Sequence, residues 1–307
     1  MKITKGKQTR AQRVVLYGVE SVGKSTFAAK FPKPLFLDIE QGTSHLNVDR
    51  CDIGSWKQLT DALTEAKATD YKTIVIDSAD WAERLCVEDL LASTKKTSVE
   101  DFGFGKGWVM VAERMSRMLS SIDQLIDAGK NVVMIAHSKI VRFEAPDALA
   151  AYDRYELKLS KQSSPLLKEF ADELWFLRFK TKVSTSETGK GKGIGGKERI
   201  LLTTHSAAYD AKTRSGLAEE LPLEWASVAH LFETTAQAVV APTATPLESW
   251  AGRLAEHEGA VNQFLLARGV LTSEQTWRDC APEYLERVAV RVDQFINTAI
   301  EWRAANK

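Results

Sequence analysis

The chain has little of what holds small secreted or metal-bound domains together. Its three cysteines, Cys51, Cys86 and Cys280, lie far apart without a C-x-x-C pair, and its five histidines lack the spacing of metal ligands. A disulfide framework and a zinc site are therefore not expected. The basic stretch 1–10 is not followed by an apolar segment, so a secretory signal is not expected either. Because apolar runs such as 132–136 are too short to cross a bilayer, we expect a soluble, cytoplasmic protein with no membrane partner.

An excess of charge of one sign is also absent. The 307 residues include 41 lysines and arginines and 41 aspartates and glutamates, so the formal net charge is zero. A polyanionic partner would therefore have to bind a local basic patch rather than the whole surface. With 44% hydrophobic and 27% charged residues, the composition is that of a globular protein with room for one large domain and one small one.

Short apolar runs alternate with helical patterns through the first ~180 residues, which predicts an α/β fold with a central, mainly parallel sheet flanked by helices. We predict strands at 13–17, 35–38, 73–77, 131–136 and 173–179, and a helix over 108–127. The glycine–lysine stretch 189–197 predicts a turn between antiparallel strands at 173–182 and 198–204.

Composition divides the chain into three parts. Residues 1–235 form the predicted core domain, and residues 236–247, rich in alanine and proline, form a predicted linker. Residues 248–307 show only helical patterns and predict a small all-helical C-terminal domain.

Residues 18–25 match the full G-x-x-x-x-G-K-S pattern of a phosphate-binding loop (Walker A), between a predicted strand and a predicted helix. Glycines in such a loop let backbone N–H groups converge on phosphate oxygens. Lys24 is predicted to reach the β- and γ-phosphates of ATP, and the Ser25 hydroxyl to bind Mg²⁺. The predicted ATP-binding residues are Gly18, Val19, Glu20, Ser21, Val22, Gly23, Lys24, Ser25 and Thr26.

A second motif supports this interpretation. The apolar strand 73–77 ends in Asp77, which fits the Walker B role of holding the Mg²⁺ shell. Hydrolysis also requires a group that orients or deprotonates the attacking water. Since Ser78 follows Asp77, the acid often found at that position is missing, and Glu40, just after strand 35–38, is the candidate. The sequence therefore predicts a Mg²⁺-dependent ATPase.

These features resemble those of bacterial RecA recombinases. In that family the phosphate loop carries a glutamate at its third position, as Glu20 here, and Walker B ends in aspartate-serine. The catalytic glutamate of the family stands in an aspartate-x-glutamate step like the one that ends at Glu40. The resemblance implies that His137, after strand 131–136, senses the γ-phosphate, although RecA has glutamine there.

Over residues 13–225 the chain is most similar to phage-encoded RecA-like proteins of single-strand annealing and recombination. The resemblance implies a DNA-stimulated ATPase in the cytoplasm of a host cell, which binds single-stranded DNA and promotes annealing or recombination. It also implies that ATP is held between subunits of a ring or filament, and that a single-stranded-DNA-binding protein is a further partner.

The resemblance also implies which residues contact DNA and the neighbouring subunit. The segment 138–164, without clear periodicity, is expected to be a functional loop that contacts single strands. The segment 95–108, which mixes aromatic residues, glycines and lysines, is a second DNA-binding candidate. The predicted DNA-contacting cations are Lys139, Arg142, Lys158, Lys161 and Lys106. Lys212 and Arg214 are predicted to reach the γ-phosphate bound by a neighbouring subunit.

Two other functions stay open at this point. The first is a nucleotide-gated assembly or loader ATPase that acts on a protein partner in phage DNA replication, with residues 248–307 gripping the partner. The second is a small-molecule or nucleotide kinase. The kinase is disfavoured because no arginine-rich lid follows the predicted sheet, and because Glu40 suits water activation better.

Overall fold

A computed structural model describes residues 5–6, 10–144, 150–185, 191–233, 254–281, 284–285, 288 and 292–306. The chain divides into two compact units, Met1–Gln237 and Ala238–Lys307. Each unit has a hydrophobic core of its own. The predicted linker 236–247 lies outside the described residues.

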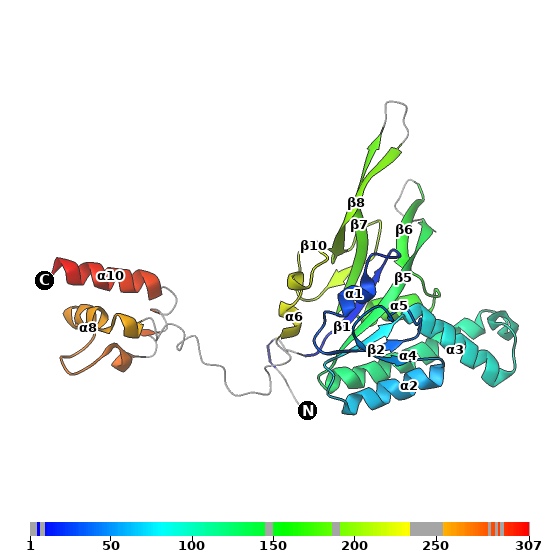
Figure 1. Ribbon diagram of the computed structural model, residues 1–307, viewed down its shortest axis with the longest axis horizontal. Helices are drawn as coiled ribbons and strands as arrows, with labels where there is room; N and C mark the ends of the chain where they lie inside the picture. Colours follow the sequence, from blue (N-terminus) through cyan, green and yellow to red (C-terminus); the bar gives the residue numbers. More distant parts are fainter. Residues whose placement is uncertain are drawn as a thin grey trace. The chain divides into compact units, whose positions relative to one another are not determined.

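The larger unit is built on one sheet, shown in Figure 1. Its strands in the described residues are β1 (Arg13–Gly18), β2 (Pro34–Asp38), β3 (Asp49–Asp52), β4 (Thr73–Asp77), β5 (Asn131–Phe143), β6 (Tyr152–Leu157), β7 (Glu173–Thr185), β8 (Gly191–Leu202), β9 (Lys212–Thr213) and β10 (Glu220–Pro222). They lie in the order β10-β8-β7-β1-β5-β4-β2-β3, with β6 beside β5 and β9 beside β7.

The centre of the sheet, from β3 to β7, is parallel, while β6, β8, β9 and β10 pair antiparallel. The predicted mainly parallel sheet is therefore confirmed. Strand β5 lies between β1, which leads into the phosphate loop, and β4, which ends at the Walker B aspartate. One strand therefore separates the strand of the phosphate loop from the strand of the Walker B aspartate.

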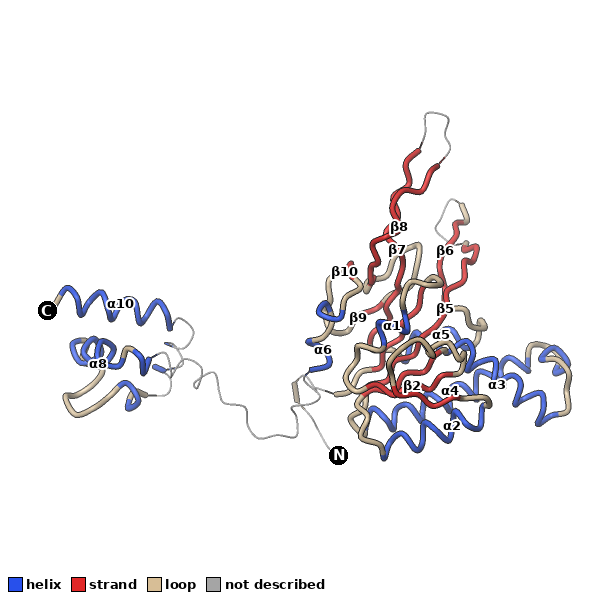
Figure 2. The backbone as a smooth tube through the Cα atoms, viewed as in Figure 1, coloured by secondary structure: helices blue, strands red, loops and turns tan. Residues whose placement is uncertain are grey.

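Helices cover both faces of the sheet (Figure 2). They are α1 (Lys24–Ala28), α2 (Trp56–Glu65), α3 (Ala79–Thr94), α4 (Lys106–Asp127), α5 (Ser163–Phe170) and α6 (His230–Glu233), with short 3-10 turns η1 (Ala66–Ala68), η2 (Val99–Phe102) and η3 (Trp225–Ser227). Val15 and Tyr17 of β1 pack with α2–α5, whereas Val14 and Leu16 pack with α1, η3 and α6. Since successive side chains point to opposite faces, a strand covered on both sides reads as a continuous apolar run.

The segment 138–164 differs from the expected loop. Strand β5 continues seven residues past the predicted strand end at 136, and β6 pairs with it antiparallel from Ser138↔Leu157 to Phe143↔Tyr152. In β5, burial falls from the core part to a largely half-exposed outer part. Among the paired residues only Arg154 and Leu157 of β6 are buried, so the hairpin lacks the hydrophobic alternation by which strands are predicted.

The other predicted hairpin is longer than expected. Strands β7 and β8 pair antiparallel, as predicted, but the pairing reaches Thr185↔Gly191, so most of the glycine–lysine stretch belongs to β8. Figure 1 shows the β5–β6 and β7–β8 hairpins extending from the same edge of the sheet.

The smaller unit contains helices α8 (Glu258–Ala267) and α10 (Val292–Ala305) and the 3-10 turn η4 (Trp277–Asp279). Its described residues include no strand, in keeping with the predicted all-helical C-terminal region. Its core holds Leu254, Val261, Phe264, Leu265, Leu271, Trp277, Cys280, Leu285, Val288, Val292, Ile296 and Ala299.

The junction of β1 and the phosphate loop gives a first prediction. A Cβ added at Gly18 would lie 2.1 Å from the Leu177 carbonyl oxygen on β7. A backbone atom cannot move aside as a flexible side chain can. We therefore expect Gly18→Ala to lower the free energy of unfolding by about 1–3 kcal/mol or more.

A urea titration of the full chain, without nucleotide, measures this effect. Gly42→Ala is the matched control, because a Cβ added there has no atom within 4 Å. We expect its stability to be unchanged or slightly higher. Equal stability of Gly18→Ala and Gly42→Ala would contradict the close β1–β7 approach.

Candidate nucleotide site

The phosphate loop joins the end of β1 to the start of α1 at Lys24. Two of its residues adopt left-handed backbone conformations, Ser21 with φ 59° and Gly23 with φ 97°. Positive φ is costly for most residues and free for glycine. The two left-handed residues give the loop a backbone path in which N–H groups can converge on an anion.

Lys24 is buried, with 7% of its surface exposed. Its Nζ donates hydrogen bonds to the carbonyl oxygens of Gly18, at 3.2 Å, and Val19, at 3.0 Å. Burial lowers the pKa of Lys24, while the nearby acids, Asp77 first among them, oppose that shift. The Lys24 ammonium group can turn from these two carbonyl oxygens to a bound phosphate. It then exchanges two neutral partners for a charged one.

Ser25 and Asp77 meet across the site. The Ser25 hydroxyl donates to Asp77 Oδ2 at 2.6 Å, and Asp77 is 5% exposed. Burial is the main cause that raises the pKa of Asp77 to about 6, and the Ser25 hydrogen bond partly opposes it. A hydroxyl and a buried carboxylate side by side are hard oxygen donors of the kind that Mg²⁺ prefers, so both predicted ligands fit the ion.

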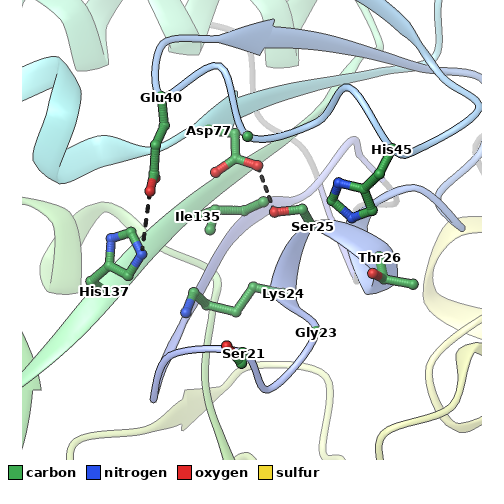
Figure 3. Close-up of a pocket in the computed structure, with 11 residues that line it drawn as sticks. Ser21, Gly23, Lys24, Ser25, Thr26, Glu40, His45, Asp77, Ile135 and His137 are labelled. Carbon is green, nitrogen blue, oxygen red and sulfur yellow. Dashed lines mark hydrogen bonds and ion pairs between the residues drawn. The ribbon is translucent and has the colours of Figure 1, made fainter.

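Glu40 lies on the loop after β2 and faces the same space. Its Oε2 accepts a long hydrogen bond of 3.5 Å from the Ser78 hydroxyl, and its Oε1 lies 3.9 Å from His137 Nε2. Figure 3 shows Glu40 and His137 pointing toward one another, to the left of Asp77 and Ser25. Asp38, the other acid of the step, instead accepts from the backbone N–H groups of Gly42 and Thr43 and shapes the loop.

His137 has a second carboxylate partner that the sequence did not predict. Asp80 Oδ2 lies 2.9 Å from His137 Nδ1, and Asp80 Oδ1 accepts from the His137 backbone N–H at 3.1 Å. The hydrogen bond to Asp80 is the main cause that raises the pKa of His137, and burial partly opposes it. The sequence signal for Asp80 is weak, because an acid in the first turn of a helix is common.

These groups surround one cavity of about 340 Å³. Its lining residues are Ser21, Gly23, Lys24, Ser25, Thr26, Glu40, Gly42, His45, Asp77, Ile135 and His137. The structure thus brings together Lys24, Glu40 and His137, predicted as catalytic, and Ser25 and Asp77, predicted as metal ligands. His45 is a further lining residue that no sequence pattern singled out. In the described part of the chain, no group of three or more His, Cys, Asp or Glu residues forms a metal cluster.

The family comparison decides what kind of protein this site belongs to. Residues 10–215 match the AAA domain family, a family of P-loop ATPases. The chain belongs to this family. The match extends from the start of β1 past β9 and includes the whole nucleotide site.

Two individual proteins are similar to this AAA-family chain. The SPbeta prophage-derived uncharacterized protein YorG of Bacillus subtilis (strain 168) is 30% identical over 137 residues, which covers 41% of this chain and 40% of that protein. The alignment thus spans well under half of that relative. A KaiC-like protein of the archaeon Pyrococcus horikoshii OT3 has a similar structure, with a TM-score of 0.39 and 15% identity, covering 69% of this chain and 85% of the other.

No helix among the described residues of the AAA-family chain is both long and apolar enough to span a membrane.

Arg199 on β8 is another residue of the site that sequence reasoning missed. Its Nη1 lies 3.4 Å from the Val22 carbonyl oxygen, and a Cβ added at Gly23 would come within 2.7 Å of the same nitrogen. Arg199 therefore supports the phosphate loop from the β7–β8 side. Nothing in the local sequence marks it, because β8 meets the loop only through the fold.

The two residues predicted to act on a neighbouring subunit lie at the other end of the sheet. Strand β9 pairs with the start of β7, whereas the phosphate loop follows the end of β1. Lys212 Nζ donates to the carbonyl oxygens of Lys168 and Glu169 of α5, and Arg214 forms an ion pair with Asp172 at 2.8 Å. Both cations thus have partners within the chain, and their action on a neighbouring subunit stays a prediction.

The predicted DNA-contacting cations fall into two groups. Lys139 and Arg142 lie on β5, and Lys158 and Lys161 follow β6, so four of them belong to one hairpin and its base. Lys139 Nζ donates to the Leu159 carbonyl oxygen at 2.6 Å, whereas Lys158 and Lys161 are exposed. Lys106 starts α4 and is not part of this hairpin.

The β5–β6 and β7–β8 hairpins enclose a groove of about 680 Å³ beside the phosphate loop. It is lined by Val19, Glu20, Ser138, Ile140, Tyr155, Arg178, Phe179 and Thr181. Arg178 Nε is buried without a hydrogen-bond partner in the described part of the chain. The groove therefore offers a guanidinium group, two aromatic rings and two residues of the phosphate loop to whatever occupies it.

The raised pKa of Asp77 gives a prediction for the nucleotide-free and metal-free protein. An acid with a higher pKa folded than unfolded stabilises the fold while protonated and loses that stabilisation as pH rises. The rise in the pKa of Asp77 from 3.8 to about 6 corresponds to a free-energy difference of roughly 3 kcal/mol, at 1.36 kcal/mol per pKa unit. We expect Asp77→Asn to gain stability relative to the wild type between about pH 4 and 7, by up to that amount.

Loss of the attraction between Asp77 and Lys24 reduces this gain. Urea titrations of both proteins from pH 4 to 8, with a chelator present, measure the difference. A difference that does not change with pH would contradict the burial of an ionisable Asp77.

Proposed function

We propose that the protein is a Mg²⁺-dependent ATPase stimulated by single-stranded DNA, which binds single strands and promotes their annealing or recombination. The observation that supports ATP hydrolysis is the meeting of Lys24, Glu40 and His137 around one cavity beside Ser25 and Asp77. Each residue has a separate task there. Lys24 and Ser25 come from the start of α1, whereas Glu40, Asp77 and His137 come from three other parts of the fold.

The proposed chemistry follows from these positions. Lys24 and the loop N–H groups hold the β- and γ-phosphates, and Ser25 and Asp77 hold Mg²⁺, which neutralises phosphate charge. Glu40, with 33% of its side chain exposed, stands at the open side, where a water molecule can reach it. It accepts the proton of the attacking water, and His137 donates a hydrogen bond toward the terminal phosphate.

The groove between the hairpins supports single-stranded nucleic acid as the polymer bound. Tyr155 and Phe179 offer aromatic surface for bases, and Arg178 offers a guanidinium for a phosphate. The Glu20 carboxylate repels a phosphate of the bound strand where the phosphate loop lines the groove. We therefore expect a nucleic-acid base at that position. Because Val19 and Glu20 belong to the phosphate loop, a strand in the groove touches the nucleotide site directly. The prophage-derived relative supports a phage origin.

We further propose that ATP lies between subunits of a ring or filament, with Lys212 and Arg214 of one subunit facing the phosphate loop of the next. These cations lie at the amino-terminal edge of the parallel strands and the phosphate loop at the carboxyl-terminal edge. Stacking of subunits edge to edge would bring the two together. Lys212 would then exchange two carbonyl partners for a phosphate.

A second candidate function is a nucleotide-gated loader that acts on a protein partner. The smaller unit favours it, since Leu266, Val270 and Ile300 are exposed apolar side chains. A cavity of about 400 Å³ lies beside Leu266 and Trp302 in this unit. An exposed apolar surface of this kind is typical of protein contacts.

Substitutions separate binding from turnover. We expect Lys24→Ala to lose ATP binding, because the buried cation is removed from the phosphate site. Glu40→Gln keeps ATP affinity, while turnover falls by about 10²–10⁴-fold, since the amide cannot accept a proton. Glu65→Gln, an exposed acid at the end of α2, is the control for loss of charge. Unchanged turnover in Glu40→Gln would remove Glu40 from the mechanism.

Binding of a labelled single-stranded oligonucleotide, measured by anisotropy with a non-hydrolysable ATP analogue, tests the groove. We expect affinity to fall steeply with salt, and Arg178→Ala to reduce the slope of log affinity against log salt by about one. Arg84→Ala, an exposed arginine on α3, is the control. Binding equal to wild type in Arg178→Ala would move the nucleic acid away from the groove.

The same measurement on a chain without residues 246–307 separates the two candidate functions. The leading proposal expects oligonucleotide binding to survive the deletion, because the groove lies wholly in the larger unit. Loss of binding would favour a function carried by the smaller unit.

A further inference from the structure

The start of α3 carries two carboxylates with little exposed surface that no part of the proposed hydrolysis uses. Asp80 lies in the first turn of the helix and Glu83 one turn later, with exposed fractions of 9% for the Asp80 side chain and 8% for Glu83. Residues three apart lie on the same face of a helix. Buried acids are costly unless hydrogen-bonded or paired, so each must have partners.

The two acids hold the two strands of the β5–β6 hairpin at its base. Asp80 accepts from His137, the last residue before the pairing with β6 begins. Glu83 accepts from the backbone N–H of Ser160 at 2.9 Å and from its hydroxyl at 2.6 Å, just after β6. Both acids are carboxylates with little exposed surface, but only Asp80 contacts a residue of the nucleotide site.

The contact with Asp80 decides which proton His137 can donate. An ionised carboxylate at Nδ1 accepts, so the Nδ1 proton is committed to Asp80. Nε2, which faces Glu40, is then a donor only when the ring carries both protons. A neutral ring held in this way would present a lone pair to a phosphate oxygen, which repels rather than binds.

We propose that Asp80 is a positioning residue, which fixes the orientation of the His137 ring and keeps it doubly protonated, so that Nε2–H points to the side of the cavity where Glu40 and the terminal phosphate meet. The inference rests on the proposed function for the role of His137 in hydrolysis. The Asp80–His137 contact itself does not depend on that function.

The charged groups around His137 agree with this assignment. They are Asp80 on α3, Glu40 after β2, Lys24 at the start of α1 and Asp77 on β4. The hydrogen bond to Asp80 raises the pKa of His137 more than burial lowers it. Burial on its own would raise the pKa of Asp80, but the hydrogen bonds and charge of His137 outweigh it and hold that pKa below its usual value.

Titration of the histidine rings by NMR, in the nucleotide-free full chain, tests the contact directly. The His137 signal is identified by its absence in His137→Gln. We expect the titration midpoint of His137 to fall in Asp80→Asn, because the amide does not favour a charged ring. Glu83→Gln, which neutralises the neighbouring buried acid, is expected to leave the midpoint unchanged. An unchanged midpoint in Asp80→Asn overturns the proposal.

Steady-state hydrolysis tests the consequence. Asp80→Asn is expected to lower kcat by about 10–100-fold with KM for ATP within about twofold, and to move the alkaline limb of the rate profile to lower pH. In a His137→Gln background, Asp80→Asn is expected to add no further loss. Equal losses in both backgrounds would show that Asp80 acts on the fold rather than through His137.

The two tests also separate this inference from the proposed function. A wild-type protein that does not hydrolyse ATP would contradict the function, while the NMR titration would still support or overturn the role of Asp80. A loss of kcat in Glu83→Gln as large as in Asp80→Asn would overturn the positioning role.

Discussion

The parallel register of the central strands is the constraint on which the site depends. Gly18 pairs with His137, Asp38 with Asp77, and Asp77 with Ile135, so β1, β2 and β4 end at one edge, beside His137 of β5. Ligands of open α/β sheets bind where such strands end. A shift of one residue in any strand would turn its terminal polar group to the opposite face. The cores on both sides of the sheet fix that register, and the nucleotide site follows from it.

The same edge gathers charges that are costly without a ligand. Lys24 and Asp77 are both buried. Burial lowers the pKa of Lys24 and raises the pKa of Asp77, so it favours the neutral form of each group. Groups held in place inside a low-dielectric site act more strongly on a phosphate than groups in water do, because little reorganisation is required. The larger unit thus maintains unfavourable electrostatics before the nucleotide binds, and in the proposed function nucleotide with Mg²⁺ compensates both charges.

Much of the core could be predicted from sequence, because motif and pattern agree there. The continuous apolar run 73–77 is β4 as found, and the glycine and lysine spacing of 18–25 is local information. The β5–β6 hairpin could not be predicted, since few of its paired residues are buried and no hydrophobic alternation marks its strands. Asp80 and Arg199 were missed because each reaches the site through a contact distant in sequence, from α3 to β5 and from β8 to the phosphate loop.

The groove beside the phosphate loop connects the nucleotide site with the proposed binding of single strands. Its walls are hairpins that extend strands of the ATPase core, and its floor includes the loop that holds phosphate. The most direct test is the rate of ATP hydrolysis by the full chain with Mg²⁺, with and without single-stranded DNA. Turnover is expected to increase several-fold with single strands and to depend on Glu40. ATP turnover that no single-stranded polynucleotide changes would contradict this expectation.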